Sequence, residues 1–339
     1  MFNSNKKIKY AIVGCGRISK RHFEAIKQDP RCLVYAACDL DENKLNSVKE
    51  FYPSIKLYKN FSDVLDDKNI DVVNICTPSG LHAGMAILAA ENGKNVIVEK
   101  PMAMLKKDAE KMIKIFSKNQ KKLCVVLQNR FNQAIQVVLN EMSKLGKLNY
   151  ISASVFWYRD QNYYNDGWHG TKEMDGGVLL NQAIHFVDMV QFISKKSIIA
   201  VSAYSATTNH VMECEDVITI NLKFSDGTLG NIQANTISYP KNYEGSILLF
   251  FDKATIKIGG SSMNEIIYWG GDIKNSLQGF RKHNSQSVYG VGHNEIIKNM
   301  NDSLLINKEI IINGAEGIKS IKVIEAIYKS INLHKEIIL

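Results

Sequence analysis

Two residues, Lys100 and His185, carry side chains that could hold or deprotonate a substrate hydroxyl group. Lys100 stands in the segment EKPM (residues 99–102), directly after an apolar run. His185 ends the segment DGGVLLNQAIH (residues 175–185), in which Asn181 stands four residues before it. Acid–base chemistry at a hydroxyl group is the reaction type that an amine and an imidazole would suit. Both residues need a scaffold to bring them to one substrate.

A glycine loop near the N-terminus supplies the first part of that scaffold. Gly14 and Gly16 stand between a strand-like run and an amphipathic stretch, with Arg17 and Ile18 following and Ser19 in place of the third small residue. In this context Gly14 permits a tight turn and Gly16 lets the backbone approach a pyrophosphate at a helix N-terminus. The loop predicts a dinucleotide site.

Asp39 sharpens this prediction. It ends the next strand-like run, about 20 residues after the glycines, where a carboxylate can bond the ribose 2′-hydroxyl. Because that carboxylate would repel a 2′-phosphate, the sequence favours NAD over NADP. The structural alternative is that Asp39 caps the helix predicted to begin near Glu42.

Two further strand ends lie at the same edge of the predicted sheet. Thr77 and Pro78 follow one strand and would line the cofactor with backbone, and His82 lies one helical turn further on. His82 could equally be part of a helix start without a ligand. Lys100 follows the next strand and would point towards the nicotinamide, where burial beside a cationic cofactor would lower a lysine pKa. An ordinary exposed lysine is the structural alternative.

Spacing makes a weaker case for His185. Asn181 and His185 lie on one face of a predicted helix, and a glycine pair before them would let that helix start close to another backbone. A histidine on such a helix is more often a core residue with satisfied hydrogen bonds. Spacing alone leaves both readings of His185 open.

The elements that must position these residues divide the chain into two predicted domains. Residues 1–125 alternate apolar strand-like runs with amphipathic helices, which predicts a parallel, doubly wound α/β sheet. Residues 126–339 contain a succession of strand-like runs with helices before and after them. Asp226-Gly227 is a hairpin signal between two of these runs. The second domain is therefore predicted to be α+β with a large, mostly antiparallel sheet.

Composition excludes several classes of protein. The net charge is +8, but the basic residues are mostly lysine and form no dense block, so we expect no nucleic-acid partner. No apolar run approaches the ~20 residues that span a bilayer, and the start lacks a secretory core. The six cysteines form no C-x-x-C pair, so we expect reduced thiols, no metal and a cytoplasmic location.

Taken together, these motifs resemble the Gfo/Idh/MocA oxidoreductase family. The matching segments run in order along nearly the whole chain: VGCGRISKRH (13–22), TPSGLH (77–82), EKPM (99–102), QNR (128–130), WHGTKEMDGGVLLNQAIHFVD (168–188) and EDVITINLKFSDGTLGNI (215–232). The resemblance implies an N-terminal Rossmann domain and a C-terminal domain whose open sheet makes oligomer contacts, as a homodimer or homotetramer. It also implies hydride transfer between NAD(P) and a carbon of a sugar, inositol or sugar nucleotide.

The resemblance assigns roles that spacing left open. Lys100 matches the family's active-site lysine and His185 its catalytic histidine, while Glu99, Gln128 and Trp168 are expected beside the cofactor. We favour His185 as the base, because its ordinary pKa of ~6.5 suits neutral pH. Arg159 could meet a substrate anion. Packing for Trp168 and a surface ion pair for Arg159 are the structural alternatives.

Asn181 narrows the choice of substrate. Many members of the family carry Asp at this position, and Asn cannot relay a proton. The Asn-containing pattern is similar to that of UDP-N-acetyl-sugar 3-dehydrogenases of surface-polysaccharide pathways, with Asn181 holding substrate. An inositol or free-sugar dehydrogenase and a non-enzymatic NAD-sensing protein remain as alternative functions.

Overall fold

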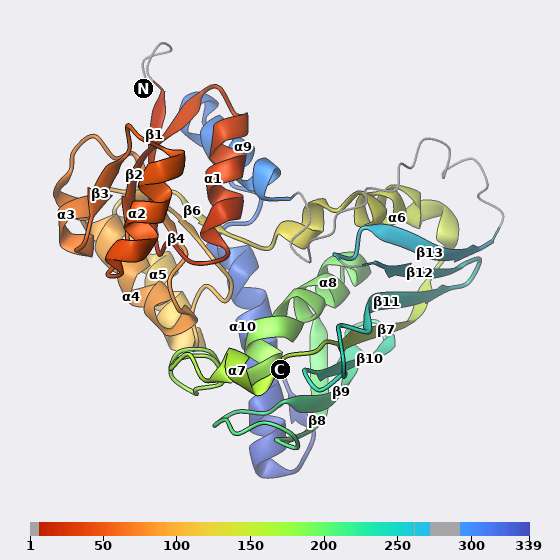
Figure 1. Ribbon diagram of the computed structural model, residues 1–339. Coiled ribbons are helices and arrows are strands. Elements are labelled where there is room, and N and C mark those ends of the chain that lie inside the picture. Colours follow the sequence, from red (N-terminus) through yellow and green to blue (C-terminus); the bar gives the residue numbers. More distant parts are fainter. Residues whose placement is uncertain (1–6, 261, 272–291) are drawn as a thin grey trace. The chain divides into compact units, whose positions relative to one another are not determined.

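The computed structural model describes residues 7–260, 262–271 and 292–339, which fall into two compact units (Figure 1). The first unit contains the described residues up to Leu127 together with His293–Ile318. The second contains the described residues of Gln128–Gly292 and Lys319–Leu339. Each unit is built around a sheet of its own.

The first unit contains a six-stranded parallel sheet in the order β3-β2-β1-β4-β5-β6. Its strands are short and mostly apolar: β1 (Ile8–Val13), β2 (Cys32–Cys38), β3 (Lys56–Tyr58), β4 (Val72–Ile75), β5 (Asn95–Val98) and β6 (Leu123–Val125). Both β4 and β5 are buried along their whole length, as expected of a parallel sheet covered on both faces. The chain order reverses between β1 and β4, and such sheets bind ligands outside the carboxyl ends of the strands at this point. The predicted doubly wound sheet is confirmed.

The helices of this unit follow the strands: α1 (Ser19–Gln28), α2 (Glu42–Phe51), α3 (Phe61–Asp66), α4 (His82–Glu91) and α5 (Lys106–Lys118). In α5 the buried side chains are Ala109, Met112 and Phe116, whose spacing of three and four places them on one face. A short 3-10 turn, η1 (Ser79–Leu81), precedes α4.

The chain returns to the first unit after its second half, which differs from the predicted boundary between residues 125 and 126. Helix α9 (His293–Ile306) packs beside α1, and the two run together in Figure 1. The Tyr10 hydroxyl donates to Oδ1 of Asn301 at 2.6 Å, and the backbone N–H of Val125 donates to Ile312 at 2.8 Å. These bonds extend the first unit to Ile318, because they satisfy polar groups of β1 and β6.

The second unit contains an eight-stranded sheet in the order β13-β12-β11-β7-β10-β9-β8-β14. Within the described part of the chain, β7 and β10 are the one parallel pair of neighbours in this sheet, and its other neighbouring strands pair antiparallel. Its strands are β7 (Leu148–Phe156), β8 (Ile198–Ala206), β9 (Val217–Phe224), β10 (Leu229–Asn235), β11 (Glu244–Phe251), β12 (Thr255–Gly259), β13 (Glu265–Gly270) and β14 (Ile337–Ile338). Asp226-Gly227 lies in the turn between β9 and β10, so the hairpin signal was correct. The predicted mostly antiparallel sheet is confirmed.

The second unit also contains several helical elements, some of which contact its sheet. They are η2 (Gln128–Phe131), α6 (Gln133–Leu145), α7 (Gln161–Tyr164), the π-helical turn η3 (Leu179–Ala183), α8 (Ile184–Ser194) and the later part of α10 (Gly314–Leu333). Nearly every residue of α8 is buried, and this helix contacts β7. Strand β9 alternates buried and exposed residues, which is the pattern of a strand with one covered face.

All six cysteines are free, and five of them are buried. Burial raises the pKa of the Cys15 thiol to about 12, so this thiol stays protonated in the glycine loop. Among the described residues, no helix combines the length and the apolar composition that a membrane crossing requires.

Candidate functional site

The glycine loop joins β1 to α1, and its two glycines meet different surroundings. Gly14 has a positive φ of +88°, and a Cβ there would lie 2.6 Å from the carbonyl oxygen of Cys76. A Cβ on Gly16 would meet no atom within 4 Å. Gly14 is thus required by the close approach of β1 and β4. The open space beside Gly16 fits a ligand that touches the backbone, as the predicted pyrophosphate would.

Asp39 reaches back from the end of β2 into this loop. Its Oδ2 accepts a hydrogen bond from the backbone N–H of Cys15 at 2.7 Å, and its Oδ1 accepts from Asp41 at 2.9 Å. The cap of α2 is Asp41, whose side chain accepts from the backbone N–H of Asn43. We had considered Asp39 as the cap of this helix, but the structure shows that Asp41 is the cap. Asp39 lies half-buried beside the glycine loop, as a ribose-binding carboxylate requires.

The remaining predicted cofactor residues of this unit lie near the strand ends. Arg17 is exposed and Ile18 is half-buried at the start of α1. Thr77 and Pro78 are half-buried after β4. His82 is buried, with Nδ1 2.7 Å from the Pro101 carbonyl oxygen and Nε2 2.9 Å from that of Thr77. The His82 ring thus ties the segment after β4 to the segment after β5, and burial lowers the pKa of this histidine.

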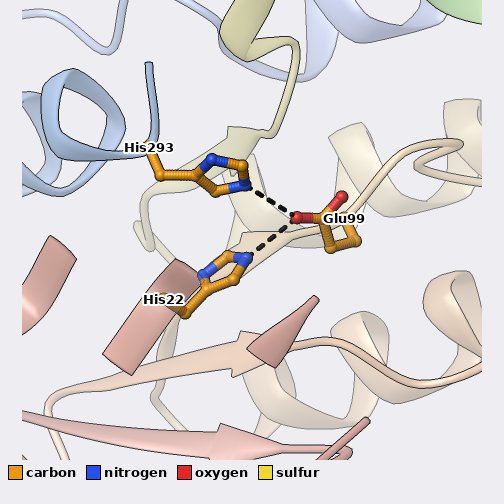
Figure 2. Close-up of side chains that lie close together, drawn as sticks. All are labelled: His22, Glu99 and His293. Atoms are coloured by element: carbon orange, nitrogen blue, oxygen red, sulfur yellow. Dashed lines mark hydrogen bonds and ion pairs between the residues drawn. The ribbon is translucent and has the colours of Figure 1, made fainter. Parts of the chain in front are cut away.

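Glu99 lies at the centre of a buried cluster directly before Lys100 (Figure 2). Its Oε1 lies 2.9 Å from Nε2 of His22 on α1 and 3.4 Å from Nε2 of His293 at the start of α9. The two imidazoles hold the pKa of the Glu99 carboxyl well below its usual range, against the opposing effect of its burial. Burial lowers the pKa of His293. The cluster is therefore a buried carboxylate held by two rings.

The donor atoms of this cluster lie within 4.8 Å of one another, which is close enough for a metal ion. The hydrogen bonds nevertheless account for the two nitrogens of His22. Nδ1 of His22 lies 2.9 Å from Nδ2 of Asn74, and the ionised Glu99 carboxylate can only accept, so Nε2 of His22 carries the hydrogen that points at Glu99. His22 in this tautomer donates to the carboxylate and offers no lone pair to a metal at Nε2.

Lys100 is half-buried just after β5, and its backbone N–H donates to Oε2 of Glu99 at 3.3 Å. The Glu99 carboxylate thus accepts hydrogen bonds both from His22 and from the backbone N–H of Lys100, the predicted catalytic lysine. Lys100 belongs to the first unit, whereas Gln128, Arg159, Trp168, Asn181 and His185 belong to the second. The meeting of Lys100 and His185 at one substrate stays a prediction.

Asn181 and His185 lie in a local change of helix type. Asn181 is in the π-helical turn η3, and His185 is buried in the first turn of α8. Such turns are rare and often occur at functional sites. Gly177, with φ of +72°, leads into this turn, and a Cβ there would lie 2.8 Å from the Glu215 carboxyl. The predicted close approach at the glycine pair is therefore to Glu215 and its neighbour Cys214.

Glu215 holds the start of this helical segment. Its carbonyl accepts from the backbone N–H of Val178, and its Oε1 accepts from Leu179 at 3.1 Å. The Tyr328 hydroxyl lies 3.1 Å from the same Oε1 and 2.7 Å from the Gly176 carbonyl oxygen. Burial raises the pKa of the Glu215 carboxyl to about 7. A carboxyl group that is about half protonated at pH 7 thus holds the start of the segment that carries Asn181.

A buried ion pair anchors the other side of the His185 helix. Arg130 of η2 makes two bonds to Asp188 of α8, from Nε at 2.9 Å and from Nη2 at 2.6 Å. Both side chains are buried, and the Arg130 guanidinium also lies over the ring of Phe192. A two-point bond fixes orientation as well as distance. This pair therefore restrains the helix turn next to His185.

Tyr163 brings together residues that the sequence treated separately. Its hydroxyl accepts a bond of 3.1 Å from Asn181, and the Arg159 guanidinium lies 5.3 Å from its ring centre. The His169 ring lies 3.9 Å from that of Tyr163, and the Trp168 ring packs on His169. Sequence reasoning missed Tyr163, since one tyrosine among 14 carries no spacing signal. Arg159, Trp168 and Asn181 thus share one cluster in the second unit.

Asp175 was also missed as a site residue. It is 1% exposed, its Oδ1 accepts from Nδ2 of Asn181 at 2.5 Å, and its Oδ2 accepts from the backbone N–H of Gly170 at 2.7 Å. The only hint in the sequence is its place directly before the glycine pair.

Comparison with known proteins matches both units. The model of the oxidoreductase family with an NAD-binding Rossmann fold matches residues 8–127, and the GFO/IDH/MocA C-terminal domain matches residues 138–257. The myo-inositol 2-dehydrogenase of Thermotoga maritima is 27% identical over 261 residues, which is 74% of each chain. The match to another curated relative spans 57% of that protein's length.

Two solved structures resemble the whole chain. The WlbA dehydrogenase of Bordetella pertussis, in complex with NADH and UDP-GlcNAcA, is 34% identical with a TM-score of 0.92, covering 99% of both chains. The WlbA dehydrogenase of Chromobacterium violaceum, in complex with the same two ligands, is 34% identical with a TM-score of 0.90, covering 99% of this chain and 97% of that one. With its glycine loop, its Asp39 and its two matching domains, the chain belongs to the Gfo/Idh/MocA family of NAD-binding oxidoreductases.

Proposed function

We propose that this oxidoreductase transfers a hydride from a secondary alcohol carbon of a nucleotide-linked sugar to NAD⁺. The favoured substrate is a UDP-linked N-acetyl sugar oxidised at C3, in the biosynthesis of surface polysaccharides. The observation that carries this proposal is the full-length likeness to two dehydrogenases that hold NADH and UDP-GlcNAcA.

The preference for NAD over NADP rests on Asp39. Its carboxylate lies at the end of β2, beside the glycine loop, with one oxygen on the Cys15 N–H. A 2′-phosphate brought to this place would meet a like charge, whereas a ribose hydroxyl could donate to it. The open space at Gly16 supports a pyrophosphate close to the backbone.

The chemistry needs one group to take the hydroxyl proton and one to hold the oxygen. NAD⁺, when bound, supplies the hydride acceptor. His185 takes the proton of the reacting hydroxyl while the C–H bond of the carbon that bears this hydroxyl breaks and the C=O bond forms. Lys100 holds the oxygen through its developing charge. The Glu99 cluster behind Lys100 and the Arg130–Asp188 pair behind His185 keep the two backbones in place.

The anionic part of the substrate would lie near Arg159. The Arg159 guanidinium lies over the ring of Tyr163, whose hydroxyl bonds to Asn181. The Arg159 cation in the neighbourhood of Asn181, which we propose binds a sugar hydroxyl, suits a uronic acid carboxylate or a diphosphate. This neighbourhood favours an acidic sugar nucleotide over a neutral free sugar.

We also expect a homodimer or homotetramer. The alternating exposure along β9 leaves one face of the eight-stranded sheet uncovered in the single chain. A second copy of the chain would bury this face. Light scattering on the purified protein measures the assembly directly.

An inositol dehydrogenase is the second candidate, favoured by the 27% identity to the Thermotoga maritima enzyme. Purified protein with NAD⁺ should produce NADH with UDP-GlcNAcA and much more slowly with myo-inositol or free hexoses. The reverse order would favour the inositol reading. Tight NADH binding without turnover of any of these compounds would favour a non-enzymatic NAD-sensing protein.

A further inference from the structure

The amide of Asn181 is oriented by its neighbours. Its Nδ2 lies 2.5 Å from Oδ1 of Asp175 and 3.1 Å from the hydroxyl oxygen of Tyr163. A carboxylate only accepts hydrogen bonds, so the atom of Asn181 that faces Asp175 must be the nitrogen. The two amide hydrogens are therefore directed at Asp175 and Tyr163. The amide oxygen Oδ1 is then the Asn181 atom that can accept a hydrogen bond from a substrate hydroxyl.

Asp175 itself is fixed by the loop before the glycine pair. Its second oxygen accepts from the backbone N–H of Gly170 at 2.7 Å, and its own backbone N–H donates to Thr171 at 3.1 Å. It is 1% exposed, so its charge is weakly screened by water. Each oxygen of Asp175 thus accepts from a protein donor, so protein groups hold the orientation of the carboxylate.

We propose that Asp175 is the positioning residue of the substrate site: it turns the Asn181 amide so that the amide oxygen receives the substrate hydroxyl. This inference rests on the proposed function.

Several titratable groups lie near Asp175, and their ionisations must be distinguished from that of Asp175 in any pH profile. Those whose pKa Asp175 helps to raise are Tyr163 and Tyr164 on α7, Cys214 and Glu215 before β9, and Tyr328 on α10. Burial is the largest cause in each case. Of these five, only Glu215 has its pKa raised to a value near neutrality, about 7. The Glu215→Gln variant identifies its titration.

Three variants test the pair: Asp175→Asn, Asn181→Asp and the double exchange. Asp175→Asn keeps an oxygen for the Gly170 N–H but turns an amide nitrogen towards Asn181, so kcat should fall about tenfold or more as the Asn181 orientation is lost. Asn181→Asp places two carboxylates together, and these must share a proton. The pH profile of kcat/KM should then gain an ionisation that neither the wild type nor Glu215→Gln shows.

The double exchange restores a donor opposite an acceptor. The amide then at position 175 would accept from Gly170 through its oxygen and donate through its nitrogen to the carboxylate at position 181, to which the Tyr163 hydroxyl would also donate. The kcat of this variant should recover to within about threefold of the wild type, without the new ionisation. Wild-type kcat and pH profile in Asp175→Asn would overturn the proposal, because Asp175 would then only hold the loop at Gly170. A double variant no better than either single variant would overturn it too.

A second measurement separates this inference from the proposed function. If the wild type does not oxidise UDP-GlcNAcA although it binds NADH, the proposed function fails. The pH dependence of the melting temperature then tests the interaction between Asp175 and Asn181. A shared proton raises one carboxyl pKa in the folded state of Asn181→Asp. Stability is then present below about pH 4 and lost as the pH rises through the folded pKa, a loss that the double exchange lacks. Equal pH dependence of Asn181→Asp and the wild type overturns the inference.

Discussion

Glu99 and His22 make a buried hydrogen bond of 2.9 Å between Oε1 and Nε2, directly behind the residue that is predicted to contact substrate. Because the other oxygen of Glu99 receives the Lys100 backbone N–H, one carboxylate joins α1 to the strand end that carries Lys100. His293 adds the start of α9 to the same carboxylate. The placement of Lys100 thus depends on groups that never touch the substrate.

Glu99→Gln should therefore destabilise the protein by about 1.5–3 kcal/mol at pH 7, the usual worth of a buried hydrogen bond to a charged group. The folded pKa of Glu99 is lowered, so its contribution is present above the unfolded value of ~4.3 and is lost as the pH falls through the folded pKa. Denaturant unfolding at pH 7 and at lower pH should show the gap to wild type narrowing on acidification. Glu91→Gln on the exposed side of α4 is the control, and a gap of the same size there would contradict the account.

Gly14→Ala and Gly16→Ala should separate folding from cofactor binding. At Gly14 the Cβ would lie 2.6 Å from the Cys76 carbonyl oxygen at a positive φ, so stability should fall by about 2 kcal/mol or more. Gly16→Ala should stay within about 1 kcal/mol of wild type, because its Cβ meets open space. Its NADH affinity should nevertheless fall at least about tenfold, since the Cβ would keep the pyrophosphate from the backbone. Undiminished NADH binding by Gly16→Ala would place the cofactor elsewhere.

Asp39→Asn should change the choice of cofactor. The variant keeps one oxygen for the Cys15 N–H but removes the charge that a 2′-phosphate would meet. The ratio of NADPH to NADH affinity should rise about tenfold or more, mainly through loss of like-charge repulsion. Fluorescence titration with both cofactors measures the ratio. Asp41→Asn, which alters the helix cap, is the matched control and should leave the ratio unchanged.

Glu215→Gln should make the protein more stable at alkaline pH. The folded pKa of Glu215 is raised to about 7 by burial, so its stabilising effect is complete below the unfolded value of ~4.3 and is lost as the pH rises through 7. A glutamine oxygen can still accept from the Leu179 N–H. Melting temperatures should agree below about pH 4 and favour the variant at pH 8. A variant that melts below the wild type at pH 8 would show that ionised Glu215 stabilises the fold.

The sequence predicted those features that local pattern determines. Apolar runs and the glycine loop predicted the parallel sheet, and Asp226-Gly227 predicted the hairpin between β9 and β10. Each of these depends on residues that are neighbours in the chain or that recur with a strand or helix period.

Contacts between distant segments could not be predicted in this way. Nothing in the amphipathic pattern of 293–318 names β1 and β6 as its partners, so the pattern alone leaves this segment in the second domain. His22 and His293 lie far apart in the chain, yet both approach Glu99, and their ring centres lie 5.2 Å apart. Asp175 reaches Asn181 because the backbone turns at the glycine pair and then enters a π-helical turn, which helical spacing does not reveal.

The central claim is that Lys100 and His185 act on one substrate hydroxyl. Steady-state NADH formation from UDP-GlcNAcA and NAD⁺, measured for wild type, Lys100→Ala and His185→Ala, tests it most directly. Each variant should lose about 100-fold or more in kcat, the scale of a positioned acid or base, while its NADH affinity stays within about threefold of wild type. Turnover within about tenfold of wild type in both variants, with NADH still bound, would contradict the claim.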